Sequence, residues 1–233
     1  MRPVVKWPVG HAYLTYTITN VYKPHKGAKK HLEANLGGYC SYCEKPVTDE
    51  AMHVEHIRPK SVHANLKFEW DNFLISCQRC NGPDNKGVKD VIVNNTHMPH
   101  LNNTYSSISY FEDGTVTVTP GLDSHETAKS RSLIELVGLD RILGHPQHLE
   151  GDKRYERRKT IWEIAVKMKT NYIKVNSSLT PDFIALCASQ MGFWSVWMKV
   201  FSDCSEVQNE LILSFNGTFL DCCKSDINRN LLP

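Results

Sequence analysis

The hydrophobic residues of the first half of the chain occur in short runs. HVEHI, residues 53–57, alternates as a strand does, and NFLIS, residues 72–76, is a second short apolar run. CQRCNG, residues 77–82, has the composition of a tight turn that opens a short helix before glycine and proline interrupt it. The pattern predicts two strands followed by a short helix.

Further along, the apolar spacing changes from that of strands to that of helices. ISYFEDGTVTVTP, residues 108–120, predicts two strands around Asp113-Gly114, a strong hairpin signal. From about Glu126 onward the apolar residues recur at helical spacing in SLIELVGLDRIL, KTIWEIAVKMKTNYIKV and TPDFIALCASQ. In the last of these, Thr180 is placed as the cap and Pro181 at the first helical position.

These elements predict an α+β protein in four parts. We expect an N-terminal extension over 1–36, a strand-strand-helix unit over 37–90, a loop and hairpin over 91–125 and a helical domain over 126–233. With 41% hydrophobic residues among 233, the chain can bury a real core.

The composition also bears on where the chain resides. The longest apolar stretch, residues 183–201, contains serine, glutamine and lysine, which favours a buried helix over a membrane span. The N-terminal residues lack the apolar core and cleavage site of a secretory signal. We therefore expect a cytoplasmic protein without membrane association, in which cysteines are metal ligands or core residues and not disulfides. A formal charge of +2 neither requires nor excludes a nucleic-acid partner.

Four of the eight cysteines form two C-x2-C pairs, Cys40 with Cys43 and Cys77 with Cys80. Each pair can present two thiolates to a tetrahedral ion from one tight turn, so the four predict a closed, structural zinc site. Such a site braces a small unit and leaves the ion no open position for chemistry. The other four, Cys187, Cys204, Cys222 and Cys223, lack this spacing and are expected to be small buried hydrophobic residues.

Polar residues of a second kind lie within and just after the segment that the cysteines frame. Glu55-His56 end the first predicted strand, Asn72 precedes the second, and Asn81 follows the last cysteine. The order C-x2-C, Glu-His-Ile-x-Pro, Asn, C-x2-C-Asn resembles the HNH nuclease family with its ββα-metal fold, over about residues 37–90. Within that family the motifs are most similar to the HNH subunit of Septu-type anti-phage systems, including those attached to retrons. That resemblance implies defence against phage and an ATPase partner that controls the nuclease.

The chemistry of these residues suits phosphodiester hydrolysis. An imidazole titrates near working pH, so His56 can be the general base, and the Asn72 amide oxygen can accept the imidazole N–H and fix its tautomer. The resemblance implies the same two roles. Glu55 and Asn81 offer hard oxygen ligands that suit Mg²⁺ or Mn²⁺, although many family members carry Asp where this chain has Glu55.

Basic residues supply candidates for phosphate contacts. These are Lys86, Arg58 and Lys60, with Asp84 and Asn85 as possible outer metal ligands. The commoner family pattern places a lysine two residues beyond the Asn, whereas four residues separate Asn81 from Lys86 here. Two further basic runs, KPHKGAKKH at 23–31 and KRYERRK at 153–159, could meet phosphates, although a solvated helix surface is the favoured interpretation of each.

Two alternatives remain beside a DNA endonuclease. The same cysteines could build a zinc-stabilised module that binds nucleic acid or protein without catalysis, with Glu55 and His56 kept for the fold. Alternatively, the nuclease could act on RNA, since no motif distinguishes the two substrates.

Overall fold

The computed structural model describes residues 1–174 and 178–223. Its central element is a two-stranded antiparallel sheet of β3 (His53–His56) and β4 (Phe73–Ser76), in which Glu55 lies opposite Leu74 and His56 opposite Phe73. A short helix, α2 (Gln78–Asn81), follows β4 directly. The predicted order of strand, strand and helix is confirmed, and so is the mixed fold class with small sheets.

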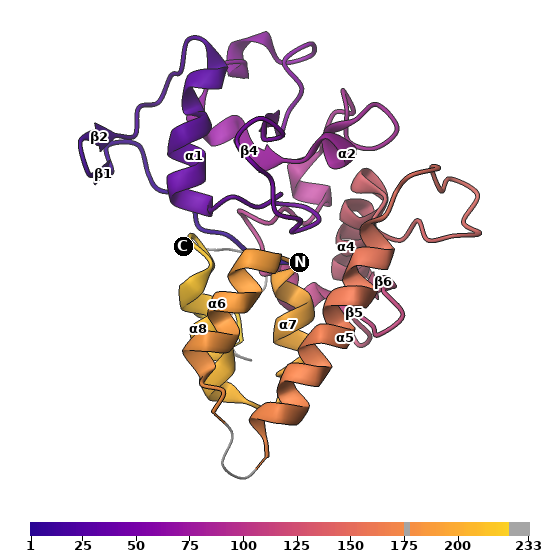
Figure 1. Cartoon of the computed structure of the whole chain (residues 1–233). Coiled ribbons are helices and arrows are strands. Elements are labelled where there is room, and N and C mark those ends of the chain that lie inside the picture. The colour runs from indigo at the N-terminus through magenta and orange to yellow at the C-terminus, as the bar shows by residue number, and fades with distance from the viewer. Residues whose placement is uncertain (175–177, 224–233) are drawn as a thin grey trace.

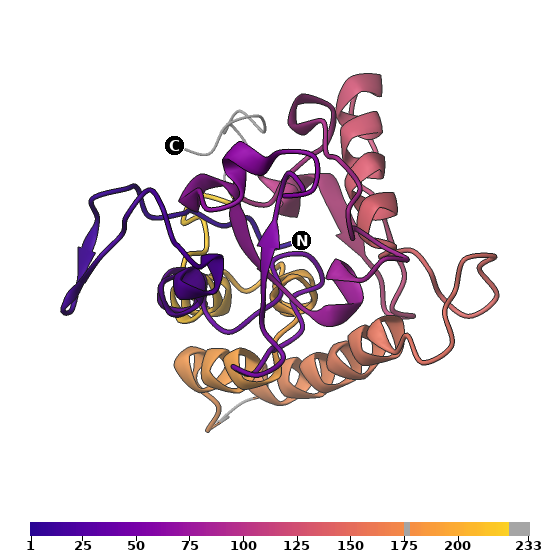
Figure 2. The same ribbon diagram turned by 90° about the horizontal axis from the view of Figure 1, so that it is seen from above.

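The N-terminal residues surround this sheet. A small hairpin of β1 (Ala12–Tyr13) and β2 (Tyr16–Thr17) projects away from the rest of the molecule (Figures 1 and 2). A 3-10 turn, η1 (His25–Ala28), leads into α1 (Lys29–Leu36), which packs against β4. All four residues of β4 are buried, as its unbroken apolar sequence suggests.

The middle of the chain contains the predicted hairpin. After α3 (Thr104–Ser107), β5 (Ile108–Tyr110) pairs with β6 (Val116–Val118), and the Asp113-Gly114 turn joins them, which confirms that prediction. The next helix, α4 (Ser124–Val137), is capped by the Asp123 carboxylate, which accepts the backbone N–H of Glu126 at 2.8 Å. Gly138 ends it in the left-handed conformation, so the apolar spacing of residues 139–143 does not continue the helix.

The remaining helices pack in pairs beneath the sheet unit (Figure 1). α5 (Arg154–Tyr172) packs against α7 (Trp194–Val200), and α6 (Pro181–Met191) against α8 (Ser205–Ser214). As predicted, α6 begins at Pro181, with Thr180 extended as its cap residue. Trp194, Trp197 and Phe201 are fully buried, so the aromatic segment is core. Among the described residues, no helix is both long and apolar enough to cross a membrane.

In the basic run at residues 153–159, Lys153, Arg157 and Lys159 are exposed as predicted for a solvated face, but the two remaining arginines are not. Arg154 and Arg158, one turn apart on α5, are 6% and 2% exposed. Arg154 donates to the carbonyls of Val137 and Gly138 and pairs with Asp152 at 2.7 Å, and Arg158 donates to Gly114 and Leu139. Both guanidinium groups donate hydrogen bonds to backbone carbonyls at the ends of neighbouring elements. They therefore connect these elements inside the protein and are not available to contact nucleic acid.

Candidate functional site

The two cysteine pairs meet where β4 passes into α2. One sulfur from each of Cys40, Cys43, Cys77 and Cys80 lies within 4.8 Å of all the others, and all four residues are buried. The Cys43 and Cys77 sulfurs are 3.7 Å apart, close to the edge of about 3.8 Å that a tetrahedron with metal–sulfur bonds of ~2.3 Å has. The donor set and its spacing fit a structural zinc ion.

Two N–H groups are directed at these sulfurs. The backbone N–H of Cys80 donates to Cys77 Sγ at 3.5 Å, and Arg154 Nη1 lies 3.3 Å from Cys80 Sγ. Such donors stabilise the negative charge that four thiolates carry even around a divalent ion. Arg154 therefore connects α5, far away in sequence, to the cysteine cluster.

Glu55 is buried together with Lys86. The carboxylate is 1% exposed, and Lys86 Nζ, on a fully buried residue, lies 3.1 Å from it while donating to the His56 carbonyl at 2.9 Å. Burial raises the pKa of Glu55 to about 7, although the nearby Lys86 ammonium group and Tyr42 hydroxyl lower it. The prediction that Lys86 contacts a phosphate is not met in this conformation, because its ammonium group serves the interior.

His56 ends β3 with its ring held in place on several sides. Nε2 lies 2.9 Å from the carbonyl oxygen of Lys67, so this nitrogen carries the proton of the neutral ring and Nδ1 carries the lone pair. The ring stacks edge-on against Phe73 and His25, at 5.2 Å and 5.0 Å between centroids. Burial, followed by the nearby lysines, lowers the pKa of His56 against the opposing effect of the Lys67 carbonyl. A neutral ring with a free lone pair can accept a proton.

Asn72 acts on the backbone instead of on the imidazole. Its Oδ1 accepts the Arg58 N–H at 2.8 Å, and its Nδ2 donates to the carbonyls of Arg58 and Leu66. The sequence interpretation, in which Asn72 accepts the His56 N–H, is therefore corrected: the Lys67 carbonyl takes that part. Asn72 instead hydrogen-bonds both ends of the loop that follows His56, at Arg58 and at Leu66.

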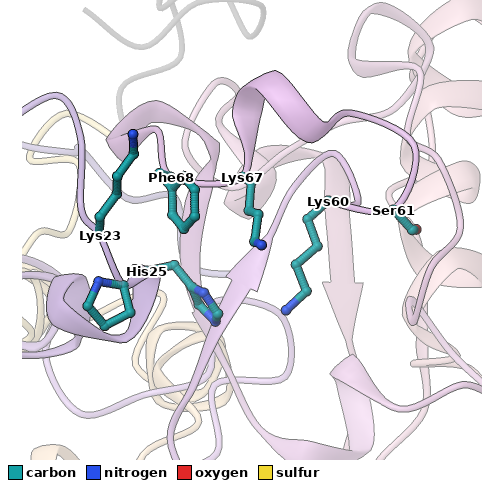
Figure 3. A pocket seen from close by; sticks show the side chains of 7 residues that line it. Lys23, His25, Lys60, Ser61, Lys67 and Phe68 are labelled. Carbon is teal, nitrogen blue, oxygen red and sulfur yellow. The ribbon is translucent and has the colours of Figure 1, made fainter.

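Two cavities adjoin on the side of His56 where the N-terminal segment lies. The larger, about 630 Å³, is lined by Lys23, Pro24, His25, Lys60, Ser61, Lys67 and Phe68 (Figure 3). The smaller, about 410 Å³, is lined by His25, Lys26, Lys29, Glu50, Met52, His53, Val54, Lys60 and Asn81. His25 and Lys60 belong to both, so we treat the two cavities as one cleft, the lysine cleft. Lys60 thus faces a space in which a phosphate could bind, and its phosphate contact remains a prediction.

Asn81 lies at the wall of this cleft, with its amide nitrogen 3.5 Å from His53 Nδ1. The oxygen donors of Asn81 and Glu55 have the chemistry that Mg²⁺ prefers. Their placement fits only in part, because Asn81 lines the cleft whereas Glu55 lies in the buried pair with Lys86. Magnesium binding by both residues would require Glu55 to separate from Lys86.

Other candidates have structural partners. Arg58 pairs with Asp90 at 3.4 Å, and Asp90 also contacts His63 at 2.8 Å, so the charge of Arg58 is partly neutralised at the surface. Asn85 is buried, and its amide bonds the Arg79 carbonyl and the Arg141 guanidinium. The carbonyl of Asp84 also accepts from Arg141. Asn85 is thus held in the interior, away from the lysine cleft.

His97 and the four cysteines outside the cluster are not among the residues that line the lysine cleft. His97 is fully buried and bonds Glu126 at 2.8 Å and two serine hydroxyls. Cys222 is buried as predicted, but Cys223 is exposed, and Cys187 and Cys204 are half-buried.

Sequence reasoning passed over several residues of the cleft, namely His25, Lys67 and Phe68. The run KPHKGAKKH did indicate phosphate contacts, but a solvated helix start was the favoured interpretation. Nothing local in the sequence indicates that residues 23–29 face Lys60, because α1, the first cysteine pair and β3 separate them along the chain.

Comparison with known proteins agrees with this site. The family model "HNH endonuclease" matches residues 40–87, which include both cysteine pairs, Glu55, His56, Asn72 and Asn81. The chain is 30% identical over 136 residues to the Septu protein PtuB of Bacillus thuringiensis, which covers 57% of this chain and 49% of that protein. It is also 30% identical over 143 residues, 57% of this chain and 67% of the relative, to a retron Vc95 protein of Vibrio cholerae serotype O1 biovar El Tor whose name describes it as an HNH endonuclease.

The chain thus spans about half of the length of the Septu relative and two thirds of the retron relative. One of these relatives is named for Septu and the other for a retron. Together with the family match and the strand-strand-helix unit that holds the cysteine cluster, these similarities place the chain in the HNH endonuclease family.

Proposed function

We propose that this protein is a metal-dependent endonuclease that hydrolyses phosphodiester bonds in DNA, with His56 as the general base. The observation that carries the proposal is the neutral His56 ring, fixed by the Lys67 carbonyl at the end of β3, next to a cleft lined by lysines. His56 Nδ1 takes the proton of the attacking water, and Lys60 and Lys67 neutralise the phosphate.

Glu55 and Asn81 are the residues that would hold Mg²⁺ or Mn²⁺. When bound, the ion supplies positive charge for the phosphate and the leaving oxygen. Asn72 contributes through its hydrogen bonds to Arg58 and Leu66, which keep the loop after His56 closed. The same bonds hold in place the segment whose Lys67 carbonyl fixes the His56 ring.

We further propose that the nuclease acts in anti-phage defence beside an ATPase that controls it. The support is the similarity to the Septu and retron proteins and the resemblance of the motifs to Septu-type systems. Such control is physically reasonable, because an unregulated nuclease without sequence preference would also cut the DNA of its own cell.

Incubation with supercoiled plasmid tests the proposal. We expect nicking or linearisation with Mg²⁺ or Mn²⁺ and none with EDTA. His56→Ala should abolish cleavage with unchanged zinc content, whereas His125→Ala, at an exposed side chain on α4, should retain it. The assay is run alone and with the ATPase and ATP, on DNA and on RNA of the same sequence.

Cleavage of RNA but not of DNA would show that the substrate is RNA. Cleavage that survives His56→Ala would overturn the catalytic assignment. If folded, zinc-loaded protein binds DNA but cuts neither substrate under any of these conditions, the non-catalytic zinc module becomes the correct description.

A further inference from the structure

His25 lies outside the segment that matches the HNH family, which spans residues 40–87. Nevertheless its ring packs at 5.0 Å and 63° against the ring of His56. It is also one of two residues that line both cavities of the lysine cleft. A substrate that crosses the cleft from one cavity to the other therefore passes His25, next to the proposed base.

The segment that carries His25 is fixed to the opposite wall by backbone hydrogen bonds. The Tyr22 N–H donates to the Phe68 carbonyl at 2.8 Å, the Trp70 N–H donates to the Asn20 carbonyl at 2.8 Å, and Val21 forms a bridge with Glu69. These bonds join the chain just before His25 to the loop that follows Lys67. The position of His25 is thus set by the fold and not by a free surface loop.

Positive charge surrounds the His25 ring. Lys23 and Lys67 each place the ammonium group over the ring of Phe68, at 5.4 Å and 5.0 Å from its centroid. Figure 3 shows the His25 ring and the amino ends of Lys60 and Lys67 turned toward the same space, while Lys23 extends in another direction. Acidic partners are sparse here, although Glu50 lines the smaller cavity and Asp49 pairs with Lys29 at 3.0 Å.

These surroundings keep His25 uncharged. Burial, Lys60, His56, Lys26 and Lys67 together lower the pKa of His25 to about 4. An uncharged imidazole adds no repulsion to a site full of lysines, and it offers a directional N–H donor that an ammonium group on a long flexible stem does not.

We propose that His25 is a further active-site residue, which donates a hydrogen bond to a phosphate oxygen of the nucleic-acid strand next to the scissile bond, while Lys60 and Lys67 supply the charge. The N-terminal segment 23–29 is thereby the second wall of the nuclease cleft. This inference rests on the proposed nuclease function and adds a residue that the family motif does not contain.

Two replacements distinguish the effect of the His25 hydrogen-bond donor from the effect of its aromatic ring. His25→Gln keeps an N–H donor and loses the aromatic contact with His56, whereas His25→Phe keeps the aromatic contact and loses the donor. We expect His25→Ala and His25→Phe to lower kcat/KM for plasmid cleavage by about ten- to a hundredfold, the range for a lost hydrogen bond to a charged group. His25→Gln should recover most of the loss, and His125→Ala should match the wild type.

A binding assay makes the test independent of turnover. In a His56→Ala background, affinity for a fluorescent single-stranded oligonucleotide is measured against salt concentration. Lys60→Ala and Lys67→Ala should each reduce the slope of log K against log salt by about 0.7. His25→Phe should weaken binding with the slope unchanged, because the residue is neutral, and Lys167→Ala, on the exposed side of α5, should change neither.

Recovery by phenylalanine but not by glutamine would overturn the proposal and leave His25 a packing residue. If His25→Phe, Lys60→Ala and Lys67→Ala all bind the oligonucleotide with unchanged affinity, the substrate does not pass through the lysine cleft, which would also overturn the proposal. Failure of the nuclease function itself looks different: cleavage would then be absent, or indifferent to His56→Ala, in the wild-type background.

Discussion

At the scale of single residues, the molecule places its strongest interactions where few atoms are exposed. The Glu55–Lys86 pair is an example, since both side chains are at most 1% exposed. Removing one member of such a pair leaves the other charge buried without compensation, which costs far more than the pair contributes.

We therefore expect Lys86→Ala to lower the free energy of unfolding by about 3–5 kcal/mol. Lys153→Ala removes an exposed ion pair with Glu156 at 3.0 Å and should leave the free energy of unfolding nearly unchanged, because solvent screens an exposed pair. Urea unfolding measures both. Equal small losses would mean that Lys86 is not held in the interior, and the double variant Glu55→Gln, Lys86→Met should recover much of the stability.

The cysteine cluster gives the second prediction at this scale. Cys80→Ser should remove bound zinc and unfold the strand-strand-helix unit, because metal binding at such sites contributes on the order of 10 kcal/mol. Elemental analysis and thermal unfolding with and without a chelator measure this. Cys204→Ser, at a half-buried cysteine outside the cluster, is the control, and a full zinc complement in Cys80→Ser would refute the assignment.

At the scale of elements, close approaches between backbones decide which glycines are required. Gly114, in the β5–β6 turn, has φ +84°, and a Cβ there would lie 2.2 Å from the Tyr155 carbonyl oxygen of α5. Gly121 has the nearly identical φ of +85° with nothing within 4 Å of such a Cβ.

Gly121→Ala should therefore cost only the conformational strain, about 1 kcal/mol. Gly114→Ala should cost clearly more, because the hairpin must also move away from α5, and with it the carbonyl that Arg158 binds. Denaturation midpoints of the two variants give the comparison. If both lose the same amount, the hairpin does not pack on α5 as described.

Elements were the level that the sequence predicted best. The C-x2-C spacing, the Asp113-Gly114 turn and the proline at the start of α6 act over a few residues, so their structures follow from local chemistry. Arg154, Lys86 and His25 were misjudged or missed, because their surroundings come from segments that only the folded chain brings near. The sequence of a basic run does not tell whether a given lysine or arginine is buried against neighbouring elements or faces solvent.

At the scale of the whole molecule, Glu44 joins three distant parts. Its carboxylate accepts the backbone N–H groups of Arg2 and Ser195, both at 2.7 Å, and the Ser195 hydroxyl at 2.6 Å, while the residue is 2% exposed. It follows the first cysteine pair directly, so it ties the cysteine cluster to the N-terminal residues and to α7.

Glu44→Gln should lower the free energy of unfolding by about 3 kcal/mol, because the amide would turn an N–H₂ group toward donors that need an acceptor. We further expect limited proteolysis to separate the helical part from residues 37–90 more readily than in the wild type. Glu156→Gln, at a 45% exposed side chain, serves as the surface control and should leave the free energy of unfolding nearly unchanged. Wild-type stability in Glu44→Gln would show that this junction does not depend on the carboxylate.

The contacts of Arg2 also fix the order in which the chain can assemble. Its guanidinium donates to the Asn216 carbonyl and the Thr218 hydroxyl, and Val4 bridges to Thr218. On the ribosome, residues 2–4 must wait for nearly the entire helical part to be synthesised before they find these partners, and closing so long a loop is slow. Residues 2–4 therefore reach their final contacts only after residue 218 has emerged from the ribosome, although they are among the first to be synthesised.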